Sequence, residues 1–269
     1  MLHYGVVACF LPATHTQACV TETPETLELI KQERALSAYL LGTLEFTEFT
    51  ALQRRLVYEI AGERDGAAVI LCDHPPGVTI GREGSRGHIR PAPEELFARG
   101  LSVRWVSRGG GAILHVAGQV ACYPIFSLDA CGLTPAGFVH RLRDVACALV
   151  HEYDVEYDVE RPEPTSVRVQ GRRLAEIGIA VRGDVTCFGL VVNVDPDLAV
   201  YRDVKCDAKG APMTSLARES QLRVRVGGVR QRLLELVAMK FGFSRVSVFH
   251  THPGITPPPI RRYAATHSS

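Results

Sequence analysis

One short stretch, "WVSRGGGAILHVAGQVACYPIF" at residues 105–126, gathers residue types that could do chemistry. Three glycines, Gly109 to Gly111, follow Arg108 and allow positive φ angles and close approach of a ligand to the backbone. The loop is not a P-loop, because no Gly-Lys-Ser/Thr follows, and it lacks the Gly-x-Gly-x-x-Gly of a dinucleotide site. Taken alone, the glycines fit a tight turn beside the core equally well. His115 alone fits a packed histidine better than a catalytic one.

Composition restricts the partners that this chain can take. Its 269 residues are 46% hydrophobic and 22% charged, with a net charge of +1, which is the balance of a globular protein with a real core. This balance gives no electrostatic reason to expect nucleic acid or an anionic membrane as a partner. No apolar run approaches 18 residues, so no transmembrane helix is expected.

The eight cysteines are spread along the chain without a Cys-x-x-Cys pair, so neither a zinc knuckle nor a thioredoxin-type motif is indicated. Four of them lie in apolar runs, where a free cysteine behaves as a small hydrophobe: Cys72, Cys122, Cys147 and Cys187. This usage predicts a reducing compartment, and the expected location is the cytoplasm. The apolar stretch at 5–19 has no lysine or arginine before it, which disfavours a secretory signal.

Hydrophobic periodicity predicts the elements that must position the loop. Helices are expected over 49–62, from Thr134-Pro135 to about His151, and near 228–242. Strands are expected over 67–74, 101–108 and 152–160, followed by a hairpin meander of 166–170, 173–182 and 185–194. The sequence therefore predicts one α/β domain with a largely antiparallel sheet.

The ends of the chain are expected to lie outside this domain. Residues 1–37 form a predicted N-terminal extension, in which Thr23-Pro24 could open a short helix. The catalytic domain is expected at 38–245. The proline-rich residues 246–269 are expected to form a mobile tail.

The glycine loop belongs to a longer pattern, Arg-Gly-Gly-Gly-x3-His-x2-Gly-Gln-x3-Tyr-Pro. This pattern resembles the octanoyltransferases of lipoate synthesis, which are relatives of lipoate and biotin ligases. Upstream "LQRRLV" and "HPPGVTIGREG", and downstream "GRRLAEIGIAV", "FGLVVNVD" and "CDAKGAPMTSL", resemble further segments of that family in the same order. The resemblance covers about residues 38–242. It implies a single biotin/lipoate-ligase-like domain of the α+β class, with a mostly antiparallel sheet flanked by helices.

The resemblance implies acyl transfer through a covalent intermediate. Octanoate arrives as a thioester on acyl carrier protein, and a cysteine takes it as an acyl-enzyme. A lysine of a lipoyl domain then attacks to form an amide, and the implied acceptors are the lipoyl domains of 2-oxoacid dehydrogenase complexes or the glycine cleavage H protein. Because the step from thioester to amide runs downhill, no cofactor and no metal is expected. The glycine loop would wall an acyl tunnel and bring backbone N–H groups to the thioester oxygen. A monomer is expected.

The family's functional residues can be carried over position by position. The nucleophile falls on Cys206, and the lysine that activates it falls on Arg173. Three segments correspond to the acyl-binding site: Arg108, Gly109, Gly110, Gly111, Ala112, Ile113, Leu114 and His115; Glu176, Ile177 and Gly178; and Gly189, Leu190 and Val191. These segments are expected to line one pocket, with Cys206 opening onto it.

Four positions depart from the family pattern: Arg173 replaces lysine, Phe188 replaces a second histidine, "LHVAG" at 114–118 replaces "YHGPG", and Asp207 replaces the glycine after the nucleophile. An arginine beside the thiol lowers its pKa by charge, but it does not readily accept a proton. His115 or Lys205 could replace the lysine as the base. Two alternatives to a working acyltransferase stay open. One is a degenerate relative that binds an acyl chain or a lipoyl domain without turnover, and the other is an ATP-dependent lipoate or biotin ligase.

Overall fold

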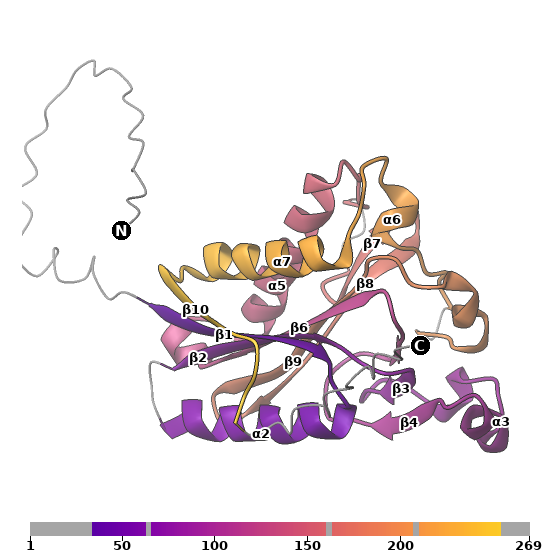
Figure 1. The fold of residues 1–269 in the computed structure, drawn as a ribbon, viewed down its shortest axis with the longest axis horizontal. Helices are drawn as coiled ribbons and strands as arrows, with labels where there is room; N and C mark the ends of the chain where they lie inside the picture. The colour runs from indigo at the N-terminus through magenta and orange to yellow at the C-terminus, as the bar shows by residue number, and fades with distance from the viewer. Residues whose placement is uncertain (1–33, 63–65, 160–162, 207–209, 254–269) are drawn as a thin grey trace, which may run out of the picture. The chain divides into compact units, whose positions relative to one another are not determined.

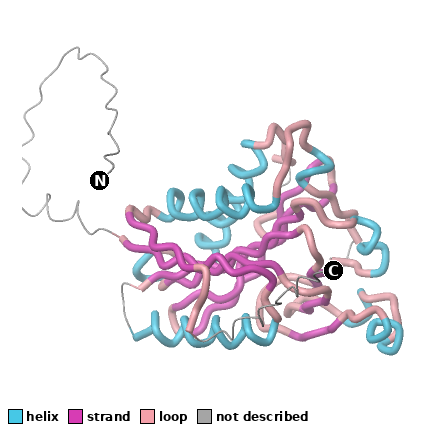
Figure 2. Tube along the Cα trace, in the orientation of Figure 1, coloured by secondary structure: helices cyan, strands magenta, loops and turns pink. Residues whose placement is uncertain are grey.

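The computed structural model describes residues 34–62, 66–159, 163–206 and 210–253. The expected helix at Thr23-Pro24 and the departure at Asp207 lie outside these residues. The described part contains one large sheet, one small sheet and the helices that cover them (Figures 1 and 2). No helix in these ranges is both long and apolar enough to cross a membrane.

The large sheet has seven strands and is mostly antiparallel. In spatial order its strands are β10 (Arg245–Phe249), β1 (Ala35–Thr43), β2 (Ala67–Asp73), β6 (Gln119–Phe126), β9 (Val185–Asn193), β8 (Arg172–Arg182) and β7 (Ser166–Val169). The strands β10, β1 and β2 are parallel neighbours, and all later pairs are antiparallel. β6 and β9 are buried at every position, as strands covered on both faces must be.

Helices cover both faces of this sheet (Figure 1). α2 (Phe46–Gly62) packs on one face, whereas α5 (Pro135–Glu152) and α7 (Val226–Phe241) pack on the other. α5 starts where the sequence predicts, because the Thr134 hydroxyl accepts a hydrogen bond from the Gly137 N–H and proline occupies the first turn. α7 ends at Gly242, whose φ of 74° is the left-handed conformation that glycine permits.

A second sheet of three strands lies beside the first. It has the order β4 (Ser102–Trp105), β3 (Gly77–Ile80) and β5 (Ala112–His115), and β5 leads into β6 of the large sheet. The shorter elements are α3 (Pro93–Ala98), α4 (Leu128–Cys131), α6 (Leu216–Glu219) and the 3₁₀ turns η1 (Arg86–His88) and η2 (Leu198–Asp203). The small sheet has a core of its own, and the glycine loop lies between β4 and β5.

The predicted fold class, the three long helices and the meander of β7, β8 and β9 are confirmed. The strand expected at 152–160 is wrong. α5 continues to Glu152, Asp154 turns the chain with a φ of 55°, and residues 155–159 are irregular. The Asp158 carboxylate accepts hydrogen bonds from the N–H groups of Gln170 and Gly171 in the β7–β8 turn. Asp158 therefore caps the β7–β8 turn, and the alternating pattern of 152–160 does not form the expected strand.

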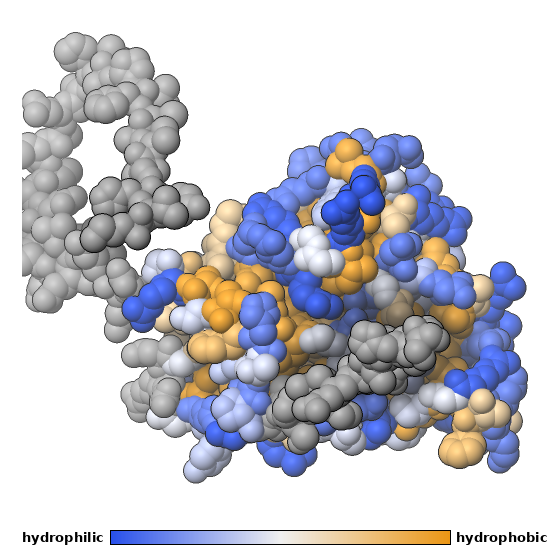
Figure 3. Space-filling view, in the orientation of Figure 1, coloured by the Kyte–Doolittle hydropathy of each residue, from blue (hydrophilic) through white to orange (hydrophobic). Residues whose placement is uncertain are grey.

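The boundaries of the domain also differ from the expected ones. Ala35 to Ser37 belong to β1, and residues 245–249 form the edge strand β10 rather than the start of a tail. β10 exposes Val246, Val248 and Phe249 in part, and an apolar area is visible over this edge in Figure 3. This strand was missed because its partner is β1, more than two hundred positions away in the chain.

Candidate active site

The glycine loop is fitted tightly against strand β8. The Gly109 N–H donates to the Ile179 carbonyl at 2.8 Å, and Gly110 has a φ of 80°. A Cβ added to Gly178 would lie 2.7 Å from the Gly109 carbonyl oxygen, so the loop can approach β8 only because that position is glycine. The Gly110 N–H donates to Glu83, so two of the three loop amides already have acceptors within the protein.

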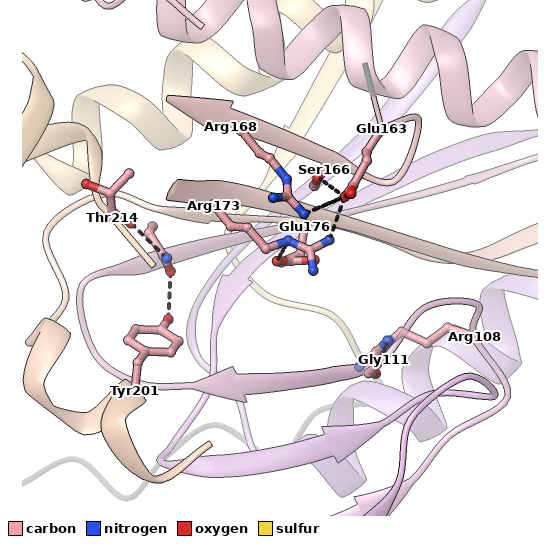
Figure 4. Close-up of polar contacts among 10 residues, drawn as sticks. Arg108, Gly111, Glu163, Ser166, Arg168, Arg173, Glu176, Tyr201 and Thr214 are labelled. Carbon is pink, nitrogen blue, oxygen red and sulfur yellow. Dashed lines mark hydrogen bonds and ion pairs between the residues drawn. The ribbon is translucent and has the colours of Figure 1, made fainter. Parts of the chain in front are cut away.

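Arg108 is a buried cation that holds the loop in shape. It is 4% exposed, and its guanidinium donates to the carbonyls of Thr79, Gly109 and Gly111 and to the Thr79 hydroxyl, at 2.9–3.0 Å. Figure 4 shows its side chain folded back against the loop at Gly111. Burial lowers the pKa of Arg108 to about 10, so it stays positively charged at neutral pH.

His115 is tied to the same threonine. Its Nε2 lies 3.0 Å from the Thr79 hydroxyl, and its ring packs edge-on against His74 with centroids 5.1 Å apart. Burial, and then the charges of His74 and Arg108, hold the pKa of His115 well below 6.5. His115 is therefore a neutral hydrogen-bonding group at pH 7 and a weak base.

Residues that the sequence analysis did not select complete this side of the site. His74 lies between the Leu44 carbonyl at 2.7 Å and the Tyr123 hydroxyl at 2.9 Å, and burial also lowers its pKa. Both residues stand in segments already noted for the family resemblance, "HPPG" and "YP", and this was the available signal. On the far side of Tyr123, Phe49 of α2 stacks at 4.2 Å between ring centroids.

Six of the predicted acyl-site residues surround one small cavity of about 10 Å³, roughly the space of one water molecule. They are Arg108, Ile113, His115, Gly178, Gly189 and Val191, and the remaining lining comes from Phe46, Thr79, Tyr123 and Phe188. Its walls are β3, β5, β6, β8, β9 and α2. The loop and the two hairpin strands thus meet around an apolar space with one cationic end. Cys206 is not among the residues that line this space, so the expected opening of Cys206 onto it is not seen.

Arg173 belongs to a charged cluster at the start of β8. Its Nε lies 2.7 Å from Oε1 of Glu176, and its guanidinium reaches Glu163 at 3.5 Å. Arg168 holds Glu163 from the other side at 2.8 Å, as Figure 4 shows. Arg173 is 5% exposed, so this ion pair with Glu176 is largely shielded from solvent.

A bulge brings Arg173 and Glu176 together. β7 pairs Arg168 with Arg173 and the preceding Val167 with Ala175, so β8 contains one extra residue. The extra residue reverses the alternation of side chains, and positions three apart come to share a face. This reversal was not visible in the sequence.

Cys206 lies in the core of the small sheet. It is 3% exposed and belongs to the same apolar cluster as Ala112 and Leu114 of β5, with Met213 packed against that cluster. The backbone of Met213 in turn pairs with the backbone of Arg173 in an isolated parallel β-bridge. The thiol is close enough to raise the pKa of both Arg108 and Tyr201 electrostatically, although burial dominates both pKa values.

A second polar network links β6, β9 and η2. The Gln119 amide donates to the Leu114 carbonyl and to Asn193 at 2.9 Å, and it also reaches the Tyr201 hydroxyl at 2.8 Å. Asn193 donates to the Thr214 carbonyl at 3.0 Å (Figure 4). Gln119 therefore holds the end of β5 and the turn that follows it, because its side-chain oxygen also accepts from the Val116 N–H. The network also connects the segment that carries Cys206 with the strands of the large sheet.

Not every predicted residue faces this region. Ile177 and Leu190 point to the opposite face of the sheet, into the core under α5 and α7, because side chains alternate along a strand. Ala112 and Leu114 likewise face the small-sheet core rather than the cavity. Lys205 is exposed, so its side chain points away from the buried Cys206 next to it.

Comparison with known proteins agrees with this fold. The model of the lipoyl protein ligase A/B catalytic domain matches residues 46–238. An octanoyltransferase of Chloroflexus aggregans is 31% identical over 217 residues, which cover 80% of this chain and 98% of that protein. An octanoyltransferase of Nitratidesulfovibrio vulgaris is 33% identical over 184 residues, or 66% and 82% of the two chains.

The solved structures show the same fold at lower identity. The crystal structure of lipoate-protein ligase A bound with ATP superposes with a TM-score of 0.62 at 15% identity, over 80% of this chain and 88% of that one. The fold is therefore that of the biotin/lipoate ligases, as the sequence implied. The chain belongs to the lipoyl protein ligase A/B catalytic domain family, and its curated relatives identify it as a transferase.

Proposed function

We propose that this chain moves an octanoyl or lipoyl group from acyl carrier protein to a lysine of a lipoyl domain, with a thioester on Cys206 as the intermediate. The main support is the apolar cavity between the glycine loop, β8 and β9, which has the buried cation Arg108 at one end. The acceptor would be a lipoyl domain of a 2-oxoacid dehydrogenase complex or the glycine cleavage H protein. The six cysteines in the described residues are free thiols, which suits the proposed cytoplasmic location.

In the loading step, the Cys206 thiol loses its proton and its sulfur attacks the carbonyl carbon of the acyl thioester. The bond from carbon to the donor's sulfur breaks, and the carrier leaves as a thiol with a proton. A positive charge near Cys206 favours the thiolate, which is the attacking species. Arg108 provides such a charge, because its hydrogen bonds go to neutral oxygens rather than to a carboxylate.

Arg173 is proposed as the second positive group beside Cys206, at the position of the family lysine. Its charge is partly compensated by Glu176 and Glu163. Arg173 therefore lowers the pKa of the thiol less than an isolated cation would.

In the transfer step, the ε-amine of the acceptor lysine attacks the acyl-enzyme, forms the amide and releases the Cys206 thiolate. The amine must lose a proton, and this chain has a poor acceptor for it. An arginine side chain is a poor proton acceptor, and the depressed pKa makes His115 a weak base. We infer that loading is faster than transfer.

The competing function is that of an ATP-dependent ligase, since a solved structure of the same fold is a ligase with bound ATP. The test incubates the protein and a lipoyl domain with octanoyl-acyl carrier protein alone, or with free octanoate, ATP and magnesium. Mass spectrometry of the lipoyl domain is the readout. Octanoylation from the carrier without nucleotide is expected. Octanoylation only with octanoate and ATP would establish the ligase reaction instead.

A further inference from the structure

Phe188 separates two spaces on the same side of the sheet. It lines the small cavity of about 10 Å³ together with Gly189 and Val191. It also lines a surface groove of about 380 Å³ between α2 and β4, which includes Gln53 and Trp105. Phe188 is therefore the side chain that closes the cavity toward this groove.

The backbone of Phe188 is held in an unusual conformation to do so. Its φ is 61°, a region that bulky residues rarely adopt. The Phe188 N–H donates to the buried side chain of Gln53 in α2 at 2.6 Å, and its ring packs edge-on against Phe49. Strained backbone that neighbouring groups enforce is typical of functional positions.

The distance from the charged cluster to Phe188 fits a short acyl chain. β9 pairs Val191 with Glu176, and Phe188 with Ile179, three positions further along. Three strand residues span about 10 Å. An extended octanoyl chain has seven carbon–carbon bonds of about 1.5 Å in a zigzag and spans about 9 Å. A chain whose carbonyl lies at the level of Glu176 thus reaches Phe188 with its last carbon.

We propose that Phe188 is the specificity-determining wall that limits the acyl group to about eight carbons. This inference rests on the proposed function, because it takes the cavity as the acyl site. The cavity must widen to admit the chain, and its apolar side chains (Phe46, Ile113, Phe188 and Val191) are the groups that can move. Without the Phe188 ring, the cavity joins the 380 Å³ groove and longer chains can pass through.

The test measures binding of free saturated fatty acids of 6, 8, 10, 12 and 14 carbons by calorimetry. All proteins carry Cys206→Ser, so that no turnover is needed. With Phe188 present, affinity is expected to rise up to octanoate and then stop rising. In Phe188→Gly it should continue to rise, by roughly fourfold for each buried methylene beyond eight carbons. Glycine also relieves the positive φ, and Phe188→Leu provides a milder change in case the glycine variant does not fold.

Trp105→Ala is the matched control, because Trp105 lines only the groove and is 66% exposed. It should leave the limit at octanoate. The proposal is overturned if Phe188→Gly and Phe188→Leu keep that limit, or if Trp105→Ala moves it. Acylation is measured separately, on the wild type that keeps Cys206. A chain-length limit that moves in the Phe188 variants, together with a wild type that octanoyl-carrier protein never acylates on Cys206, supports the wall and rejects the proposed reaction. Acylation of wild-type Cys206, together with a chain-length limit that stays at octanoate in the Phe188 variants, supports the proposed reaction and rejects the wall.

Discussion

Arg173 and Glu176 lie side by side on β8, with Nε and Oε1 2.7 Å apart, although they are three positions apart on a strand. The bulge between them turns both toward the glycine-loop side of the sheet. In the proposed reaction Arg173 has the role of the family lysine, and the carboxylate of Glu176 partly compensates its charge. On that proposal, the positive charge acting on Cys206 depends on both residues.

Replacing the carboxylate should make the thiol more reactive. In Glu176→Gln the charge of Arg173 is no longer compensated at 2.7 Å, so the pKa of Cys206 should fall by about half a unit to one unit. The rate at which iodoacetamide alkylates Cys206 at pH 7, followed by peptide mapping, should then rise about three- to tenfold. Glu163→Gln is the control, because Glu163 is more exposed and its contact is 3.5 Å, and its effect should be smaller. A slower alkylation in Glu176→Gln would contradict this account.

Changing Arg173 itself should separate the two half-reactions. Arg173→Lys should speed transfer to the lipoyl domain more than loading, because lysine can accept and return a proton. Arg173→Ala should slow both steps by roughly one to two decades through the lost positive charge. Single-turnover mass spectrometry of enzyme and acceptor measures both rates. Wild-type rates in Arg173→Ala would mean that another group, such as His115 or Lys205, has this role.

The close approach of the loop to β8 should be essential for loading. In Gly178→Ala the new Cβ would lie 2.7 Å from the Gly109 carbonyl and 3.0 Å from the Arg108 side chain, so the loop must shift. A loss of loading by at least tenfold is expected, with the fold retained by circular dichroism. Gly42→Ala is the control, because no atom lies within 4 Å of its added Cβ. Normal loading in Gly178→Ala would exclude this packing as a requirement.

The buried histidines should make the protein less stable in mild acid. The pKa values of His74 and His115 are lowered in the folded state, so below about pH 6.5 the unfolded chain binds protons that the folded protein does not. The free energy of unfolding should therefore fall by up to about 1.4 kcal/mol per pH unit for each histidine, between pH 6.5 and its folded pKa. Urea unfolding at pH 7.5, 6 and 5 measures this slope. His115→Gln should have a shallower slope than the wild type, and an equal slope would show that His115 does not contribute.

Much of the fold follows from local patterns. The apolar stripe of α2, the Thr134-Pro135 start of α5 and the two-residue turns between β7, β8 and β9 are all readable from the sequence. The four residues of β3 have no period to detect, and β10 depends on a partner near the other end of the chain. At 152–160 the alternating pattern gives no strand, because the chain turns at Asp154 and Asp158 instead binds the β7–β8 turn.

The residues of the candidate site also fall into those that the sequence predicts and those that it does not. The glycine loop was readable from its three consecutive glycines, whereas Gly178 and Gly189 were selected only through the family resemblance. The structure gives the physical reason for glycine at both positions, because an added Cβ would collide with neighbouring backbone. The pairing of Arg173 with Glu176 was not, because it depends on one extra residue in β8. Ile177 and Leu190 were selected with their segments, although the strand period places them on the far face.

The central claim is that Cys206 carries the acyl group. The most direct measurement is the intact mass of the protein after mixing with octanoyl-acyl carrier protein, followed by peptide mapping. A gain of one octanoyl group on Cys206 is expected, and Cys206→Ser should abolish it whereas Cys131→Ser should not. An octanoyl group that never appears on Cys206 of the wild type, or that still forms in Cys206→Ser, would contradict the account.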